Sequence, residues 1–217
     1  MVIASILGFF KSSKDVDSLS AAQAKLAAGE APLIVAATEE DIEFLVASYA
    51  KATSEGTVAK TSDVRRFIER CLKVSKRESQ HDTHQHPFIV GQPPTRPLDD
   101  IFILKVGEVS IGILWLRDHN DQRLAPETFG EMIFLWIRPE LRRYGCWPHA
   151  DKFSKNWAQE KKKTYLVGRC LSPSRRMAEL FGRSDYQLKG TSPKGMTVHL
   201  WTPEKKSKRW ALTKLRS

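Results

Sequence analysis

The chain has 217 residues, of which 41% are hydrophobic and 28% are charged, and it carries a formal net charge of +10. This length favours one domain with extensions over two full domains, and the composition is that of a globular protein, which excludes intrinsic disorder and collagen-like structure. No apolar run approaches the ~18 residues of a membrane-spanning helix, and the three widely spaced cysteines exclude a disulfide framework and predict a reducing, cytoplasmic setting.

Residues 1–30 are predicted to form an arm outside the main domain. Its tip, residues 1–10, is apolar, but no basic residue precedes it and no small-x-small site follows it, so a signal peptide is not expected. The tip either packs back on the core or docks into a partner. An Ala-rich run follows, which Asp17 or Ser18 can N-cap and which Gly29 can close in a left-handed conformation, so a short helix is expected.

A strand and two helices are predicted next. Residues 32–36 are apolar and are typical of a strand, and Thr38 and Asp41 then supply a capping box for an amphipathic helix. A second helix is predicted over residues 62–76, because apolar residues recur on one of its faces. Cys71 lies in that apolar stripe and is expected to be a core residue.

A histidine-rich segment and a proline-rich segment come before the next strands. Residues 81–86 contain three histidines and an aspartate, donor types that suit zinc. Because no other Cys or His pair stands at a metal-binding spacing, a loop without a metal site is predicted. Residues 92–97 contain three prolines, which disfavour both a helix and a central strand.

The middle of the chain is predicted to be a hairpin, a central strand and a helix. Residues 100–117 alternate in character around a Gly-Glu turn, which indicates an antiparallel hairpin. Residues 129–137 are apolar almost throughout, so this strand is expected to be buried on both faces, and Pro139 ends it. A basic loop then leads into a helix expected from Pro148 to about Lys162, since proline favours the first helical position.

Four further elements complete an α/β (α+β) layout. They are a strand over residues 164–170, a short helix over 172–181 and closing strands over 186–189 and 196–201. The loop between the central strand and the next helix is the candidate anion site. The first amides of a helix are unsatisfied donors, and its dipole favours negative charge there.

Four passages in this order resemble the GNAT superfamily of acyl-CoA-dependent N-acyltransferases, over residues 33–201. They are similar to the family's opening strand and first helix, its second and third strands, its fourth strand with the pyrophosphate loop, and the helix that flanks the thioester. In this chain they are residues 33–41, 100–117, 130–145 and 172–181. The resemblance implies one domain over residues 31–203, with a mixed, mostly antiparallel sheet of about six or seven strands and about four flanking helices.

The resemblance also implies acetyl-CoA or another acyl-CoA as cofactor, and it implies roles for individual residues. Glu131 matches the carboxylate that deprotonates the incoming amine; the alternative is a strand residue held by a neighbouring cation. Ser174 matches an asparagine that contacts the pantetheine. The backbone groups that would pair with the pantetheine arm belong to Leu135, Trp136 and Ile137. The amides that would cradle the pyrophosphate lie in the loop of Arg142, Arg143, Tyr144, Gly145, Cys146 and Trp147.

Three departures from the family pattern bear on catalysis. Trp147 stands where the loop usually has Gly or Ala, so a large side chain would crowd a phosphate, and Pro148 removes one amide donor. Phe181 stands where a tyrosine would protonate the leaving thiolate, and a phenyl ring cannot donate a proton. The pyrophosphate loop is therefore expected to be degenerate.

Two functions remain open at this point. One is an atypical GNAT-like N-acyltransferase that uses Glu131 as its base and acts on an unidentified amine. The other is a catalytically inactive structural or binding protein on the GNAT fold, for example an internal virion or core protein of a phage. Degenerate GNAT-like domains of this type occur among the core proteins of short-tailed phages.

The excess of positive charge lies entirely in the C-terminal part of the chain. Residues 138–217 contain 20 Lys/Arg against 6 Asp/Glu, whereas residues 1–137 contain 15 against 19. This asymmetry favours a polyanion such as nucleic acid, or an acidic assembly partner, bound through residues 138–217. A solvated basic face is the alternative. The tail over residues 204–217, with six Lys/Arg, is predicted to lie outside the domain.

Overall fold

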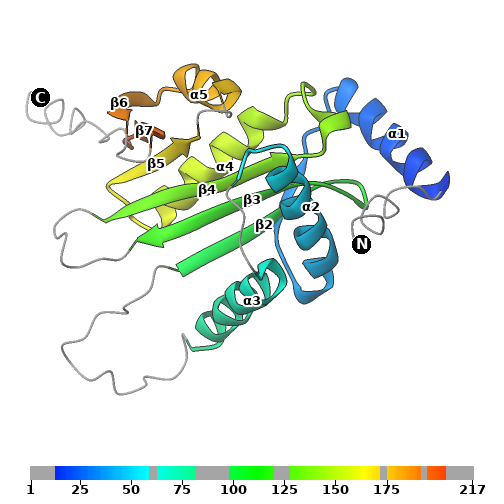
Figure 1. Ribbon diagram of the computed structural model, residues 1–217, viewed down its shortest axis with the longest axis horizontal. Helices are drawn as coiled ribbons and strands as arrows, with labels where there is room; N and C mark the ends of the chain where they lie inside the picture. The colour runs from blue at the N-terminus through cyan, green and yellow to red at the C-terminus, as the bar shows by residue number, and fades with distance from the viewer. Residues whose placement is uncertain are drawn as a thin grey trace, which may run out of the picture.

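The computed structural model describes residues 13–58, 63–81, 98–119, 128–171, 175–191 and 195–203 (Figure 1). The α-helices of this part are α1 (Ser13–Ala27), α2 (Ile42–Ser54), α3 (Val64–His81), α4 (Cys146–Glu160) and α5 (Arg175–Gly182). The strands are β1 (Leu33–Ala36), β2 (Leu98–Val106), β3 (Val109–His119), β4 (Phe129–Ile137), β5 (Tyr165–Cys170), β6 (Gln187–Thr191) and β7 (Thr197–Trp201).

The seven strands form one sheet in the order β1-β2-β3-β4-β5-β7-β6. Every neighbouring pair is antiparallel except β4 and β5, which run parallel. A parallel pair needs a long crossover connection, and α4 is that crossover. The expected mixed, mostly antiparallel sheet is therefore confirmed. α2 to α5 are the four expected flanking helices, and α1 is a fifth.

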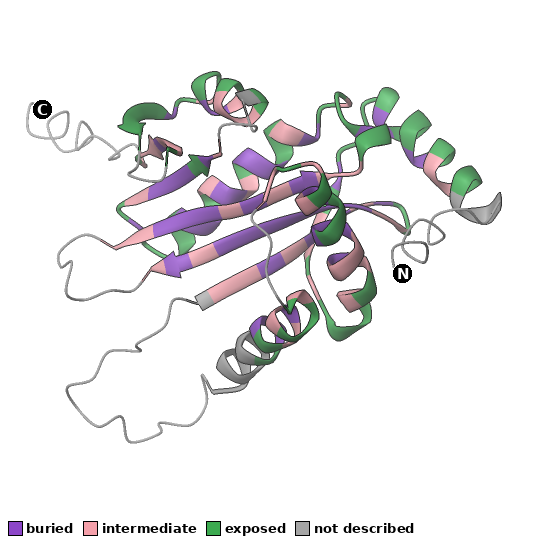
Figure 2. Cartoon of the chain, in the orientation of Figure 1, coloured by how far each residue is buried: buried purple, intermediate pink, exposed green. Residues whose placement is uncertain are grey.

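Helices cover both faces of the sheet (Figure 1). On one face, Leu45 of α2 and Ile68 of α3 share a buried cluster with Ile103 of β2. On the other face, Ala150 of α4 shares a second cluster with Leu114 of β3, and α1 and α5 contribute to it as well. Burial is concentrated in the central strands (Figure 2). The two clusters pack against opposite faces of the centre of the sheet, where the candidate site lies.

Gly29 and the capping box of Thr38 and Asp41 have the structural roles expected of them. Gly29 follows α1 in a left-handed conformation with a φ of +88°. The capping box is present, with the Thr38 amide donating to Asp41 Oδ2 at 2.9 Å. It caps a 3₁₀ turn over Glu39–Asp41 that leads directly into α2. β4 has the bounds predicted for the central strand.

Three helices differ from their predicted bounds. α1 already begins at Ser13, so Asp17 and Ser18 lie inside it and neither is its N-cap. α4 begins at Cys146, two residues before the expected start, because the left-handed Gly145 is its N-cap. Pro148 is then the third residue of the helix, where the amide still has no intrahelical partner and proline is tolerated. α3 extends beyond its predicted end to His81, so the first residue of the histidine-rich segment is helical. The remainder of that segment lies outside the described residues.

The N-terminal helix packs on the sheet. Ala22 and Leu26 of α1 are buried in the cluster that also contains residues of α4. The apolar tip, the basic tail and Ser174 lie outside the described residues, and the division of the chain at residues 30 and 203 stays a prediction. The cysteines are all buried and free. Among the described helices, none is long and apolar enough to cross a membrane.

Candidate active site

β4 and β5 diverge halfway along their length. They pair in parallel from Phe129 opposite Tyr165 to Met132 opposite Gly168, and there the pairing ends. β4 continues beside β3 up to Ile137, whereas β5 continues beside β7. The β3–β4 register also shifts next to Met132, which indicates a β-bulge there. A bulge bends its strand, so the second half of β4 leaves β5 and a wedge opens between them.

The backbone of β4 supplies hydrogen-bonding groups to this wedge. The Arg138 amide donates to the Ile111 carbonyl of β3 at 2.9 Å. Backbone groups of successive residues alternate between the two sides of a strand, so those of Leu135 and Ile137 face away from β3, whereas those of Trp136 face it. Of the three residues predicted to pair with pantetheine, two therefore have backbone groups on the open side.

The Arg142 side chain already occupies one of these backbone groups, the Ile137 carbonyl. Its Nε donates to the Ile137 carbonyl at 2.9 Å, and its Nη2 donates to Glu55 Oε2 at 2.6 Å. The side chain thus ties the end of β4 to the turn that follows α2. The Leu135 amide and carbonyl and the Ile137 amide are the backbone groups of the wedge that a bound chain would pair with.

The loop after β4 brings the first amides of α4 to the mouth of the wedge. Arg143 and Gly145 both have left-handed backbones, with φ values of 80° and 76°. A Cβ added at Gly145 would meet no atom within 4 Å, so the loop faces open space there. Cys146 and Trp147 are the first two residues of α4 and contribute amides. Open space, helix amides and the helix dipole together fit a phosphate group.

Tyr144 and Cys146 face inward rather than toward a ligand. The Tyr144 hydroxyl accepts a hydrogen bond from Gln23 Nε2, so α1 is fastened to this loop. Cys146 is buried, and burial raises the pKa of its thiol. Among the loop residues predicted to bind pyrophosphate, these two contribute backbone groups at most. Arg143 is exposed.

Trp147 and Phe181 close one side of the wedge. Trp147 Nε1 donates to Ser184 Oγ at 2.7 Å, and its ring packs edge-on against Phe181 with centroids 5.2 Å apart. The bulk of Trp147 therefore lies between the first turn of α4 and α5. Phe181 is buried directly over Gly168, the last β5 residue that pairs with β4. An apolar ring thus sits at the apex of the wedge.

Glu131 lies beside the same apex, on the face of the sheet that α2 and α3 cover. Its carboxylate contacts two side chains from neighbouring strands: His119 Nε2 lies 2.7 Å from Oε2, and the Arg169 guanidinium pairs with Oε1. Next to it, Arg117 Nε donates to Asp99 Oδ1 at 2.6 Å. Five charged or ionisable side chains from four adjacent strands thus form one polar cluster.

The cluster keeps Glu131 ionised. Burial alone would raise the pKa of this carboxyl, but the hydrogen bond from His119 and the charge of Arg169 outweigh it, so its pKa lies below the usual value. Cys71 of α3 approaches the cluster with its Sγ 3.6 Å from Asp99 Oδ2, and burial raises the pKa of its thiol to about 12. Cys71 is therefore no nucleophile at neutral pH.

Solved structures share this architecture. The ribosomal-protein-S5-alanine acetyltransferase from Vibrio fischeri matches 79% of this chain and 93% of its own, with a TM-score of 0.59 at 10% identity. The ribosomal-protein-alanine N-acetyltransferase from Brucella melitensis matches 78% of this chain and 99% of its own, with a TM-score of 0.56 at 14% identity. The chain has the GNAT acetyltransferase fold.

A structure with a bound cofactor is also similar. The PaiA N-acetyltransferase from Thermoplasma acidophilum, solved in complex with coenzyme A, matches 79% of this chain and 99% of its own, with a TM-score of 0.53 at 9% identity. No protein-family model matches the sequence, and no curated protein matches it in sequence either. The likeness to known proteins is therefore one of GNAT fold.

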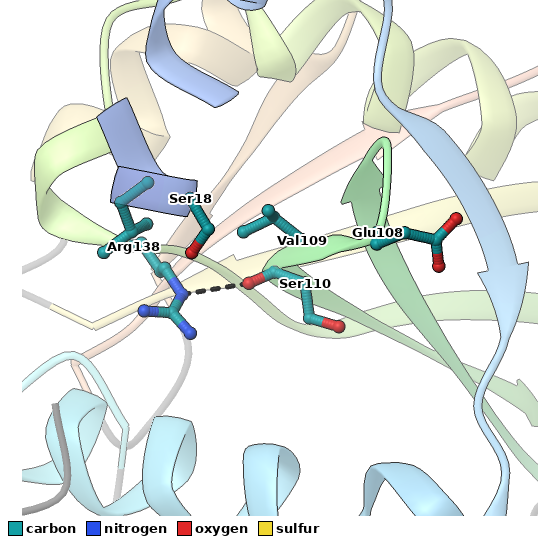
Figure 3. Close-up of a pocket in the computed structure, with 6 residues that line it drawn as sticks. Ser18, Glu108, Val109, Ser110 and Arg138 are labelled. Atoms are coloured by element: carbon teal, nitrogen blue, oxygen red, sulfur yellow. Dashed lines mark hydrogen bonds between the residues drawn. The ribbon is translucent and has the colours of Figure 1, made fainter. Parts of the chain in front are cut away.

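The GNAT fold of this chain has a second hollow, on the other side of β4. It has a volume of about 270 Å³ and lies between α1, the β2–β3 turn and Arg138 (Figure 3). Arg138 Nε donates to the Ser110 carbonyl at 2.9 Å, and its guanidinium lies 5.4 Å from the centre of the Phe44 ring. This hollow is separate from the wedge, because it lies on the β3 side of β4.

The sequence alone did not point to His119, Arg169, Arg117 or Asp99. Arg117 and Arg169 lie on predicted strands, whereas Asp99 and His119 lie just outside the hairpin predicted over residues 100–117, because β2 begins at Leu98 and β3 continues to His119. The approach of all four to Glu131 depends on the register across β2, β3, β4 and β5. Alternation along the hairpin would have placed His119 on the same face as Arg117. Within the described residues, no three His, Cys, Asp or Glu side chains gather as a metal site requires.

Replacing Glu131 with Gln is expected to destabilise the protein by about 2 kcal/mol at neutral pH, since hydrogen bonds to charged groups contribute about this much. Because the folded pKa of Glu131 is lowered, this stability is present above the usual value of 4.5 and is lost as the pH falls below it. Urea unfolding at pH 7 and at acidic pH would measure the difference. The loss of stability should be smaller at acidic pH. The exposed control Glu140→Gln should leave stability unchanged at both pH values.

Proposed function

We propose that the protein is an acyl-CoA-dependent N-acyltransferase, which transfers an acyl group from acetyl-CoA or another acyl-CoA to an amine. The observation that carries this proposal is the divergence of β4 and β5 at Met132 and Gly168, with the start of α4 at its mouth. A sheet gains nothing in stability from unpaired backbone groups. A wedge lined by such groups is therefore best explained as a ligand site.

The residues of the wedge fit an acyl-CoA. The Leu135 backbone and the Ile137 amide would pair with the amides of the pantetheine arm. The amides of Cys146 and Trp147 would hold the pyrophosphate across the open space in front of Gly145. Arg143 is exposed beside them and adds positive charge. Acyl-CoA would supply an activated thioester carbonyl near the apex, beside the polar cluster of Glu131.

The transfer then needs a base that accepts the amine proton and a source of a proton for the departing thiolate. The amine nitrogen attacks the thioester carbon, the C–N bond forms, the C–S bond breaks, and the amine proton passes to a base in the polar cluster. Phe181 cannot protonate the departing thiolate, so that proton comes from water. Loss of the tyrosine donor predicts slow turnover, because positioned proton transfer contributes about 10²–10⁴-fold to a rate.

Calorimetry with acetyl-CoA tests the proposal directly. We expect binding by the wild type and its loss in Gly145→Glu, since a carboxylate at the N-cap of α4 would repel the pyrophosphate. The matched control is Gly145→Gln, which imposes the same strain at a φ of 76° without the charge and should retain more affinity. Equal loss in both variants, or no heat from the wild type at millimolar ligand, would count against the site.

Turnover can be followed as thiol release from acetyl-CoA with added amines. Two of the matched structures are named as ribosomal-protein-alanine acetyltransferases, so peptides with an N-terminal alanine are a reasonable first acceptor, with small primary amines as a second set. A protein that binds acetyl-CoA but releases no thiol with either set would be a cofactor-binding protein and not a transferase.

A binding protein on the GNAT fold is the second candidate. The Phe181 ring at the apex of the wedge and the Ile137 carbonyl held by Arg142 both favour it, because each fills a place that a pantetheine arm would need. Its partner would be a polyanion or an acidic protein on residues 138–217, in the cytoplasm or within a virion. Failure to bind acetyl-CoA together with salt-dependent binding to a DNA duplex would support it.

A further inference from the structure

His119 and Glu131 form a hydrogen-bonded pair near the apex of the wedge, with Glu131 next to Met132 and His119 opposite Phe129. His119 is the last residue of β3, and Glu131 is the third residue of β4. Only 7% of the Glu131 side chain is exposed, against 22% for His119. Of the two groups, the imidazole is therefore the more accessible to an amine that comes from solvent.

The protonation state of Glu131 fixes the tautomer of His119. The carboxylate is ionised and can only accept hydrogen bonds. The contact at 2.7 Å must therefore be a donation from the imidazole Nε2–H to Glu131 Oε2. In the neutral ring, Nδ1 is then the nitrogen that carries the lone pair and can take up a proton. Glu131 already accepts from two partners and is a poor base by comparison.

Aromatic rings hold the plane of the imidazole. His119 stacks on Phe129 with ring centres 4.3 Å apart and an interplanar angle of 15°. Phe129 in turn stacks on Tyr165 at 5.4 Å and 5°. Because these three residues are direct neighbours across β3, β4 and β5, the stack is fixed by the sheet. The stacked rings thus restrict rotation of the His119 imidazole out of its plane.

The charged and ionisable groups of the polar cluster and its surroundings come from β2, β3, β4, β5 and α3. They are Glu131 of β4, Arg169 and Tyr165 of β5, Arg117 of β3 with its partner Asp99 of β2, and Cys71 of α3. Arg117 is paired with Asp99, and Arg169 is paired with Glu131. After proton uptake, the imidazolium would form an ion pair with Glu131.

We propose that His119 is the general base of the transfer and that Glu131 is a positioning residue, which orients the imidazole through Nε2. This inference rests on the proposed acyltransfer. The amine nitrogen bonds to the thioester carbon and its proton moves to His119 Nδ1. The C–S bond breaks, the thiolate leaves with the bonding electrons and takes a proton from water, and His119 returns its proton to solvent.

The pH dependence of turnover in His119→Gln and Glu131→Gln tests this assignment. The wild type should lose activity toward acidic pH, where the base of the transfer is protonated. His119→Gln should lower kcat about 100-fold and remove that acid limb, with acetyl-CoA affinity unchanged. Glu131→Gln should lower kcat less and keep the limb. Glu131 itself cannot produce a limb near neutral pH, since its pKa lies below the usual value.

The opposite pattern would overturn the assignment: an acid limb that is lost in Glu131→Gln and retained in His119→Gln makes Glu131 the base. Nitrogen-15 NMR of the wild type at neutral pH gives a second readout that needs no acceptor. A proton on Nε2 is expected, and a proton on Nδ1 would equally overturn the proposal. Absence of both acetyl-CoA binding and turnover would instead reject the proposed function and this inference with it.

Discussion

Replacing Lys163 with Met is expected to destabilise the fold by about 3–5 kcal/mol, because it leaves a buried carboxylate without its partner. Lys163 Nζ pairs with Asp118 Oδ1, and only 2% and 4% of the two side chains are exposed. Urea unfolding followed by circular dichroism would measure the change. Lys162→Met is the matched control, since Lys162 is the exposed neighbour and should change stability by less than about 0.5 kcal/mol.

A double variant separates the charge effect from the loss of packing. Asp118→Leu combined with Lys163→Met removes both charges, so it should recover part of the stability that the single variant loses. A single variant that costs less than about 1 kcal/mol would mean that water reaches the pair. A double variant no better than the single would mean that Lys163 acts through its methylene chain.

This ion pair also bears on the candidate site. Asp118 directly precedes His119 on β3, and alternation along the strand puts the two side chains on opposite faces. Lys163 stands just before β5. The pair therefore ties the end of β3 to the start of β5 from the α4 side, while the polar cluster does so from the other side. Its loss should displace His119 as well as destabilise the fold.

Local signals explain why much of the fold could be predicted. The bounds of β4 followed from an apolar run that ends before Pro139, and the β2–β3 hairpin followed from alternation around Gly107. Both depend on residues close in sequence. The start of α4 was less predictable, because Pro148 is compatible with several positions of a first turn, and the left-handed Gly145 decided between them.

Only the part of the candidate site whose residues are consecutive in the sequence was predictable. The loop after β4 was identified because strand, loop and helix are consecutive. The partners of Glu131 could not be identified in this way, since Arg169 lies 38 residues away and approaches only through the β4–β5 register. The same holds for the contact of Phe181 with Gly168. Such contacts depend on strand order, which the sequence specifies only through the complete fold.

Replacing Gly168 with Ala is expected to destabilise the protein by about 3 kcal/mol through overpacking. A Cβ at this position would overlap the ring of Phe181. The ring cannot withdraw, because it is buried between Trp147, Tyr186 and His199. Thermal or urea unfolding measures the cost. Gly182→Ala is the control, since a Cβ there meets no atom within 4 Å and should leave stability nearly unchanged.

Replacing Phe181 with the smaller Leu should restore part of the stability that Gly168→Ala loses. Phe181→Leu alone costs stability by leaving a cavity, but in the Gly168→Ala background it makes room for the new methyl group. The double-mutant cycle should therefore show a favourable coupling of about 1–3 kcal/mol. Additive effects would mean that the ring moves aside freely. Strong coupling would mean that Phe181 fills the apex as part of the core, so that a thiolate formed there must leave without a protonating side chain at that position.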